Sequence, residues 1–258
     1  KAQFRDAVMD PFVRAYETGC TPNPCINCNR YLKFEELFRQ ADQLGCELIV
    51  TGHYARVEHN EETGRWELKK ATFLEKDQSY VLYNLTSNQL KKLILPLGAY
   101  SKPQVREFAK KAGLINYDKA DSQDICFIPD GDYGAFLEKE AGDRIPGEGN
   151  FVTTDGTVIG RHKGVTHYTI GQRKGLNLAM GHPVFVTDIR PKTNEVVIGE
   201  AQDVFTTELV CNKLNFMSIE DLDAPRKVLA KIRYAHKGTM CTIERTGEDT
   251  VHCTFDEP

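Results

Sequence analysis

The sequence contains no apolar run approaching the 18 residues that a membrane-spanning helix needs, and its first residues do not form a secretory signal. Internal repeats and low-complexity segments are also missing. Of its 258 residues, 40% are hydrophobic and 27% are charged, as in globular proteins with a sizeable core. We therefore expect a cytoplasmic protein of more than one domain, with no membrane partner.

A second Cys-x-x-Cys pair is missing as well. Cys25 and Cys28 form such a pair, whereas a structural zinc site usually takes four ligands, from two pairs or from added histidines. Eight cysteines without a secretory signal favour reduced thiols over disulfides. Three kinds of site remain open for the pair: a metal site, a redox dithiol and a single reactive thiolate.

The residues around the pair give evidence on the metal site and on the redox dithiol. Adding Cys20 gives C-x4-C-x2-C, which matches part of an iron–sulfur spacing, but a fourth cysteine would be far away in the sequence. A thioredoxin-like dithiol begins a helix after a strand, whereas the preceding residues here are Thr-Pro-Asn-Pro. Both alternatives stay open beside the reactive thiolate.

The position of Cys28 favours the thiolate. Apolar residues recur at three- and four-residue steps after Tyr31 and stop at Gly45, which predicts an amphipathic helix that starts near Tyr31. Cys28 would then lie at the helix N-terminus beside Arg30, and both features lower the pKa of a thiol. Cys126 follows a polar segment, and two thiols in two loops suggest a sulfur relay. We interpret the cysteines inside predicted strands or helices as structural: Cys46, Cys211, Cys241 and Cys253.

The first half of the chain predicts an α/β domain. Residues 47–50 form a short apolar run after the helix, which is typical of a parallel strand, and Thr51-Gly52-His53 would lie at its carboxyl end, where open α/β sheets hold ligands. Thr86 and Ser101 each have a glutamine three residues later, the capping-box pattern of a helix start.

The second half predicts β structure. Glycine and threonine become frequent from about residue 145, and two apolar runs flank Pro-Lys-Thr-Asn-Glu, which predicts a hairpin. We expect three domains: an α/β catalytic domain over 1–144, a central β-rich domain over 145–206 and a truncated β-barrel over 207–258. Residues 161–174 hold four Lys or Arg and residues 226–237 hold five, with no acid in either. In a chain of net charge −4, these stretches are either solvated faces or local nucleic-acid patches.

Eight motifs, in this order, resemble the tRNA-specific 2-thiouridylase family across essentially the whole chain. They are TPNPCINCNRYLKF (21–34), TGHYA (51–55), KDQSYVLY (76–83), KPQVR (102–106), DSQDICFI (121–128), GQRKGL (171–176), RY (233–234) and FDEP (255–258). The resemblance implies an adenine nucleotide alpha-hydrolase-like, Rossmann-like sheet in the first domain. It also implies a monomeric enzyme that uses ATP with magnesium to place sulfur on C2 of the wobble uridine of tRNA.

The resemblance further implies roles for individual residues. Cys28 matches the nucleophile, and Cys126 matches the cysteine that receives a persulfide from a sulfur-donor protein; the two should be able to close a disulfide. Gly52 matches an ATP contact. The positions that match tRNA contacts are Asn23, Pro24 and Cys25 at the target base, together with His53, Lys76, Asp77, Gln78, Arg233 and Tyr234. Arg173 and Lys174 lie in a glycine-flanked basic loop, and given the resemblance we expect this loop to face tRNA.

Two departures from the family pattern matter. Many relatives carry Asp where this sequence has Cys25, so a carboxylate base cannot be assumed there. The family's Ser-Gly-Gly-x-Asp-Ser phosphate loop does not occur in these residues, so we expect a fragment that lacks this loop and the end of the barrel and is inactive alone. Two other interpretations remain: an RNA-binding module with zinc or with an iron–sulfur cluster on Cys25, Cys28 and Cys126, and ATP-pyrophosphatase chemistry on a small molecule.

Overall fold

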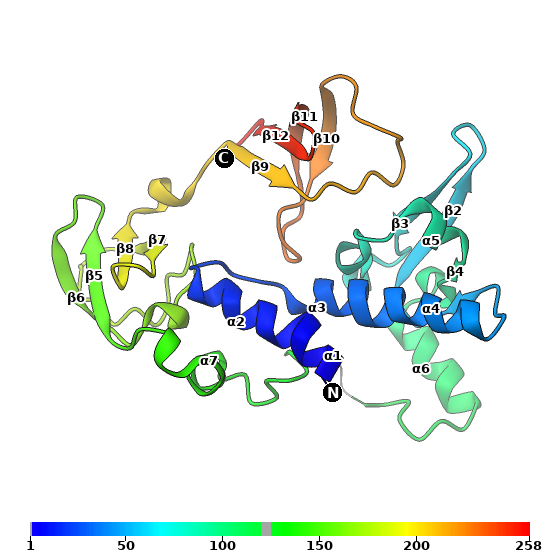
Figure 1. Cartoon of the computed structure of the whole chain (residues 1–258), viewed down its shortest axis with the longest axis horizontal. Helices are drawn as coiled ribbons and strands as arrows, with labels where there is room; N and C mark the ends of the chain where they lie inside the picture. Colours follow the sequence, from blue (N-terminus) through cyan, green and yellow to red (C-terminus); the bar gives the residue numbers. More distant parts are fainter. Residues whose placement is uncertain (1, 120–124) are drawn as a thin grey trace. The chain divides into compact units, whose positions relative to one another are not determined.

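The computed structural model describes residues 2–119 and 125–258. Contacts divide the chain into two compact units, one made of Lys1–Pro24 with Ser122–Thr206 and the other of Cys25–Asp121 with Thr207–Pro258 (Figure 1). Each unit therefore combines segments that are far apart in the sequence. The domain ranges expected from the sequence stay a prediction.

The helical part of the first unit packs aromatic side chains around Phe12. Phe12 is 1% exposed, and its ring centroid lies 5.5 Å from that of Phe127 in an edge-to-face contact, a favoured geometry for aromatic pairs. The helical elements are α1 (Ala2–Phe4), η1 (Arg5–Met9), α2 (Asp10–Glu17), α7 (Tyr133–Ala141) and η6 (Gly142–Arg144). Arg5 of η1 forms a 2.7 Å ion pair with Glu140 of α7, which joins these two helical elements.

The β part of the first unit is a four-stranded mixed sheet of order β6-β5-β8-β7. Its elements are β5 (Gly149–Thr153), β6 (Val158–His162), η7 (Val165–His167), β7 (Phe185–Arg190), β8 (Glu195–Gly199) and η8 (Ala201–Val204). β7 and β8 form the hairpin predicted from Pro-Lys-Thr-Asn-Glu, and Asn194 in its turn has a φ of 52°, a conformation that Asn tolerates. Phe151, Val186 and Val196 are at most 1% exposed and form the core of this sheet.

In the second unit, one continuous helical run precedes a small parallel sheet. The run is α3 (Pro24–Asn27), η2 (Cys28–Glu35) and α4 (Glu36–Gln43), and it packs Phe34 and Phe38 into a core with Leu82 and Leu90. β1 (Ile49–Val50) pairs in parallel with β4 (Leu93–Ile94), which confirms the predicted parallel strand. The run begins at Pro24, so the prediction of a helix starting near Tyr31 is wrong: the proline that suggests a loop is well suited to a first helical turn.

The remaining elements of this region follow local sequence signals. α5 (Ser87–Lys91) and α6 (Lys102–Lys111) begin with the expected capping boxes, at Thr86 and Ser101 respectively. β2 (Ala55–Asn60) and β3 (Arg65–Lys70) form an antiparallel hairpin that the sequence analysis did not predict. The short helical turns are η3 (Leu74–Lys76), η4 (Ser79–Leu82) and η5 (Pro96–Ala99).

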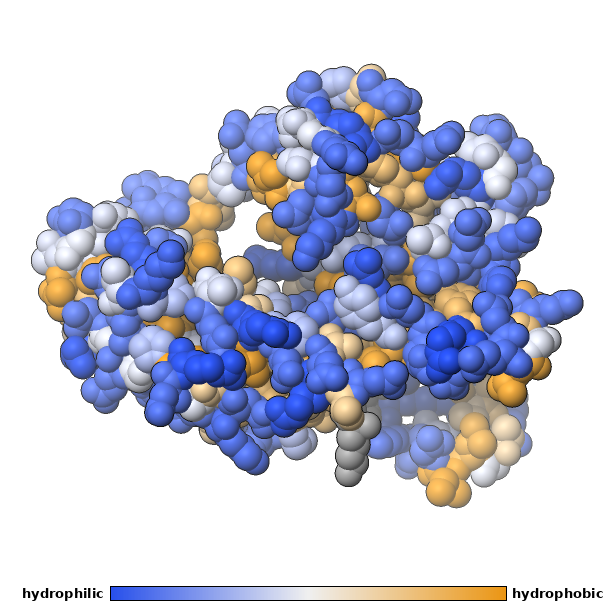
Figure 2. Space-filling model, in the orientation of Figure 1, coloured by the Kyte–Doolittle hydropathy of each residue, from blue (hydrophilic) through white to orange (hydrophobic). Residues whose placement is uncertain are grey.

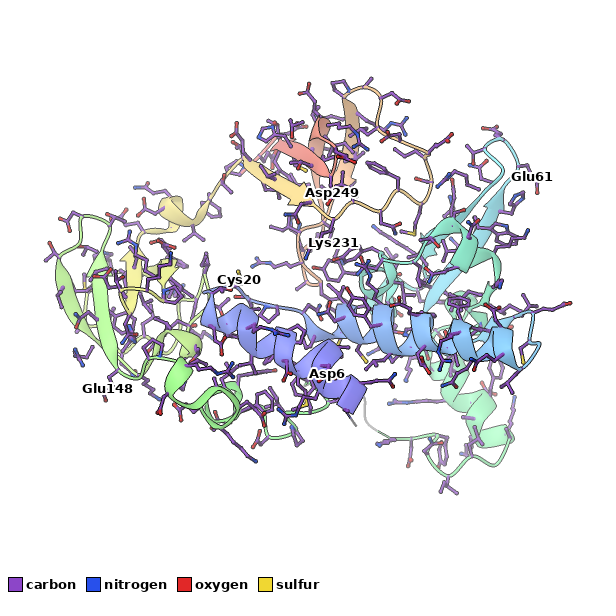
Figure 3. The ribbon with its side chains drawn as sticks, in the orientation of Figure 1. Asp6, Cys20, Glu61, Glu148, Lys231 and Asp249 are labelled. Atoms are coloured by element: carbon purple, nitrogen blue, oxygen red, sulfur yellow. The ribbon has the colours of Figure 1, made fainter. Side chains whose placement is uncertain are left out.

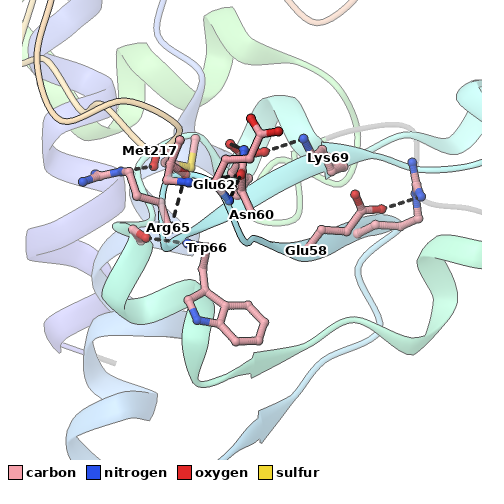
Figure 4. Close-up of polar contacts among 11 residues, drawn as sticks. Glu58, Asn60, Glu62, Arg65, Trp66, Lys69 and Met217 are labelled. Carbon is pink, nitrogen blue, oxygen red and sulfur yellow. Dashed lines mark hydrogen bonds and ion pairs between the residues drawn. The ribbon is translucent and has the colours of Figure 1, made fainter.

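The C-terminal part of this unit is an antiparallel sheet of order β10-β11-β12-β9. Its strands are β9 (Glu208–Asn212), β10 (Arg226–Ala230), β11 (Thr239–Gly247) and β12 (Thr250–Phe255). Arg65 of the β2–β3 hairpin fastens the loop after β9, because its guanidinium donates to the carbonyls of Met217 at 2.8 Å and Phe216 at 3.0 Å (Figure 4). Asn215 adds bonds to the carbonyls of Tyr83 and Leu85. The sheet is thus fixed to the α/β part of the same unit.

No helix in the described ranges, 2–119 and 125–258, has the length and apolar character to cross a membrane. Hydrophilic residues cover most of the face in Figure 2, and apolar residues form scattered patches on it.

Candidate active site

The two cysteines of the Cys-x-x-Cys pair lie one helical turn apart. Because the helical run starts at Pro24, Cys25 belongs to its first turn and Cys28 to its second. The effect of the helix dipole fades beyond the first turn, so it acts mainly on Cys25 and supports a reactive Cys28 less than the sequence suggested. The backbone becomes π-helical at Cys28, a rare conformation that is frequent at functional sites.

Asn29, the residue after Cys28, is joined to the end of β1 by a line of hydrogen bonds. Its amide nitrogen donates to the carbonyl of Val81 at 3.3 Å, which leaves Asn29 Oδ1 as an acceptor 3.2 Å from Nε2 of His53. The other ring nitrogen, Nδ1, lies 3.0 Å from Thr51 Oγ1. A neutral histidine with its proton on Nε2 satisfies every group in this line. The helix of Cys28 is therefore held to Thr51-Gly52-His53.

Burial keeps His53 in that neutral form. The residue is 8% exposed, its ring centroid lies 5.6 Å from that of Phe34, and burial together with the nearby charge of Lys33 lowers its pKa to about 4. A neutral, buried imidazole suits a structural position next to the cysteine turn. The contact with tRNA expected for His53 stays a prediction.

A pocket of about 370 Å³ opens at the carboxyl end of β1, where the sequence predicted a ligand site. Its polar lining consists of Thr51 and His53 together with Lys33, Glu36 and Gln40 of the helical run, and Leu32 and Leu37 of the same run are its apolar lining. Gly52 lies between Thr51 and His53, and a Cβ built there would come no closer than 3.6 Å to Leu97. A side chain is therefore tolerated in this conformation, and any ATP contact by Gly52 would use its backbone.

Residues 76–78, which were expected to contact tRNA, also brace the fold. Asp77 is 9% exposed and accepts hydrogen bonds from the amide of Ala71 at 2.8 Å and from the hydroxyl of Ser79 at 2.6 Å. Gln78 pairs with Tyr54 through two bonds, of 2.9 Å and 2.7 Å. Gln78 thus holds this segment to the residue before β2, and Asp77 holds it to the residue after β3. Their contacts with tRNA stay predictions.

The other predicted tRNA residues are distributed over both units. Arg233 and Tyr234 are exposed in the loop between β10 and β11 of the second unit. Arg173 and Lys174 are exposed in the first unit, in a loop shaped by a bond from the Gln172 side chain to the Lys174 carbonyl. Asn23 and Pro24 come directly before Cys25, and the side chain of Pro24 is buried.

Cys126 is exposed and belongs to the first unit, so the two predicted sulfur-handling thiols lie in different units. Ile128, two residues later, is 1% exposed and anchors the segment in the core around Phe12. Residues 121–124 of the same motif lie outside the described residues.

The cysteines interpreted as structural fall into two groups. Cys241 and Cys253 are buried in the C-terminal sheet, and burial raises the pKa of Cys253 to about 12, so it stays a thiol. Cys46 and Cys211 are exposed, and Cys211 Sγ lies 3.9 Å from Cys253 Sγ. Within residues 2–119 and 125–258, no three Cys, His, Asp or Glu side chains are grouped to hold a metal ion. The cluster alternative on Cys25, Cys28 and Cys126 stays a prediction.

Comparison with protein families defines the class of the protein. Residues 1–130 match the family model described as tRNA methyl transferase HUP domain, and residues 134–200 match tRNA methyl transferase PRC-barrel domain. A HUP domain implies the use of ATP, and the two together define a tRNA-modifying enzyme. They confirm the predicted fold class of a nucleotide hydrolase-like α/β domain followed by a β-rich domain.

Individual relatives narrow the class further. The chain is 51% identical to the tRNA-specific 2-thiouridylase MnmA of Lachnoclostridium phytofermentans, and the match covers all of this chain and 72% of that relative. It is 49% identical to the same enzyme of Clostridioides difficile and of Carboxydothermus hydrogenoformans, over 98% and 99% of this chain and 70% of each relative. The chain belongs to the tRNA-specific 2-thiouridylase family, whose members are sulfurtransferases that act on tRNA. The family resemblance seen in the sequence is confirmed.

Proposed function

We propose that Cys28 and Cys126 carry out the sulfur transfer of this family and that the pocket beside His53 receives part of the ATP. The observation that carries the proposal is the line Asn29–His53–Thr51, which ties the helix of Cys28 to the carboxyl end of β1. Two cysteines outside the buried core suit sulfur transfer.

In the proposed reaction, ATP adenylates O2 of the target uridine and releases pyrophosphate. The sulfur-donor protein has by then converted Cys126 to a persulfide. The outer sulfur of that persulfide adds to C2, and AMP leaves with the original oxygen. Cys28 then attacks the inner sulfur of the resulting Cys126–S–S–C2 linkage, so that the outer sulfur stays on the tRNA and a Cys28–Cys126 disulfide forms. A dithiol reductant restores the two thiols with two electrons, which completes the balance.

The residues of the pocket suit one end of a nucleotide. Lys33 offers a positive charge for a phosphate or for the adenylate in a lining that also contains the carboxylate of Glu36. Gly52 lies between the lining residues Thr51 and His53 and would offer its backbone. Magnesium would arrive with the phosphates, which are its usual ligands. We propose that the protein acts as a monomer in the cytoplasm, where cysteines are kept reduced.

Sulfur loading of two cysteine variants tests the assignment. In a full-length enzyme of the family that carries these residues, Cys28→Ser should abolish thiolation of tRNA and leave Cys126 able to accept sulfur from a cysteine-desulfurase system, seen by mass spectrometry as one added sulfur atom on its peptide. Cys126→Ser should prevent loading altogether, and Cys46→Ser, at another exposed cysteine, should change neither result. If Cys126→Ser still accumulated a persulfide on Cys28 and thiolated tRNA, the two roles would be wrong and Cys25 would be the next candidate.

A further inference from the structure

Three tyrosines and one lysine gather on the second unit, and we call Tyr80, Tyr83, Tyr234 and Lys231 the tyrosine cluster. The ring centroid of Tyr80 lies 6.2 Å from that of Tyr83 and 6.1 Å from that of Tyr234, in edge-to-face contacts. Lys231, labelled in Figure 3, places its ammonium 5.7 Å from the centroid of Tyr80 and 5.4 Å from that of Tyr234. Such distances give attractive cation–π contacts.

Tyr80 forms the base of the cluster, and the other two tyrosines face solvent. Its hydroxyl donates to the carbonyl of Ile232 at 3.5 Å, and burial raises its pKa, so it stays neutral. Tyr83 and Tyr234 are 43% and 51% exposed, and neighbouring Ile232 is 55% exposed. Because these two tyrosine rings are held in place and remain exposed to solvent, they form a surface that suits ligand binding.

The surroundings of the cluster are basic. A pocket of about 400 Å³ next to Tyr234 is lined by three lysines, Lys70, Lys231 and Lys237, together with His236 and the acids Glu75 and Asp77. Three lysines face two carboxylates in this lining, so the pocket has an excess of positive charge. A ligand with a flat ring and a negative charge matches both the tyrosines and the lysines.

We propose that the tyrosine cluster binds an unpaired nucleotide of the tRNA anticodon loop other than the uridine that is modified, by stacking its base on Tyr83 and Tyr234 and drawing its phosphate toward Lys231. The inference rests on the proposed function, because it assumes tRNA as the substrate. Proteins recognise single-stranded RNA loops by stacking splayed bases on aromatic rings beside basic side chains. Contacts of tRNA with Arg233 and Tyr234 are already expected from the sequence. The inference adds contacts with Tyr83 and Lys231 and gives Tyr80 a supporting position.

Binding of a hairpin RNA to the 258-residue chain tests the inference. The hairpin has the anticodon stem and loop, with the fluorescent base 2-aminopurine at one loop position other than the target. Tyr83→Leu and Lys231→Gln should each weaken binding by about tenfold, and Tyr83→Leu should also remove the stacking-induced quenching of 2-aminopurine. Tyr83→Phe should preserve both, because the ring remains. A fully paired RNA of the same length should bind all variants alike.

A matched control separates this surface from general effects of aromatic residues. Tyr100 is 40% exposed in the same unit and makes an edge-to-face contact with Phe108 at 5.2 Å, so Tyr100→Leu removes a comparable ring. Its affinity for the hairpin should equal that of the unchanged chain. Equal affinity of Tyr83→Leu and the unchanged chain, or equal losses for Tyr83→Leu and Tyr100→Leu, would overturn the proposal.

Persulfide loading distinguishes this inference from the proposed function. Loading of Cys126 by the donor requires no RNA, so the tyrosine variants should load normally. A loss of loading in Tyr83→Leu, with hairpin binding unchanged, would show that the surface binds the donor protein and would overturn the proposal. If the cysteine variants contradicted the sulfur relay while Tyr83→Leu still lost hairpin binding, the proposed function would fail and this inference would stand.

Discussion

Asn29 Oδ1 lies 3.2 Å from Nε2 of His53, and this contact joins the helix of Cys28 to the end of β1. The two residues are 4% and 8% exposed, so water cannot replace either partner. The position of the cysteine turn therefore depends on two buried side chains that do not themselves carry sulfur.

Asn29→Ala should lower the free energy of unfolding by about 2 kcal/mol, because the variant leaves His53 Nε2 and the carbonyl of Val81 buried without partners. Urea unfolding followed by circular dichroism measures the change. Asn88→Ala is the matched control, because Asn88 is exposed on α5 and alanine favours helices. An equal loss in the two variants would contradict a special contribution from Asn29.

The pKa of about 4 for His53 predicts a specific dependence of stability on pH. The folded state disfavours protonation relative to an unfolded histidine of pKa about 6.5, so the full stabilisation is present above pH 6.5 and is lost as the pH falls toward 4. Between pH 7 and pH 5 the loss should be about 2 kcal/mol. His53→Gln should lack this part of the pH dependence, and parallel curves for both proteins in urea unfolding would show that His53 is not its source.

Changing Arg173 and Lys174 to Ala should weaken binding of tRNA and reduce its dependence on salt. Each phosphate contact contributes roughly 0.7 to 0.9 to the slope of log affinity against log salt, so the double variant should lose about 1.5. Filter binding across a salt series gives the slope. Lys139 and Lys192 are exposed in the same unit, and their double alanine variant is the control. An unchanged slope would mean that Arg173 and Lys174 lie on a solvated face.

Residues 1–258 should bind ATP only weakly. The sequence contains no Ser-Gly-Gly-x-Asp-Ser loop whose amides would surround the phosphates, and the pocket at β1 offers Lys33 and the backbone of Gly52 in its place. Isothermal titration calorimetry with magnesium–ATP measures the affinity. Lys33→Met should weaken it further, whereas Lys91→Met, at the end of α5 and in the lining of a different pocket, should not. Micromolar affinity for the unchanged chain would contradict the prediction.

Local signals allowed several elements to be predicted from the sequence. The capping boxes at Thr86 and Ser101 depend on residues three positions apart, and both helices start there. The apolar run ending at Val50 also predicted β1 and its parallel pairing, because a helix followed by a short apolar segment is typical of α/β sheets. The start of the helix at Pro24 was missed, since proline is common both in loops and in first helical turns.

The sequence by itself determined the family, the order of the α/β and β parts and the identity of the candidate cysteines, because these follow from motifs of contiguous residues. The tertiary structure decided the rest. The burial of His53 and its bond to Asn29 bridge 24 positions, and the contact of Tyr80 with Ile232 bridges 152. No spacing rule reaches across such distances, because the partners meet only when packing of the core brings the helix onto β1 and fixes the C-terminal sheet to the β2–β3 hairpin.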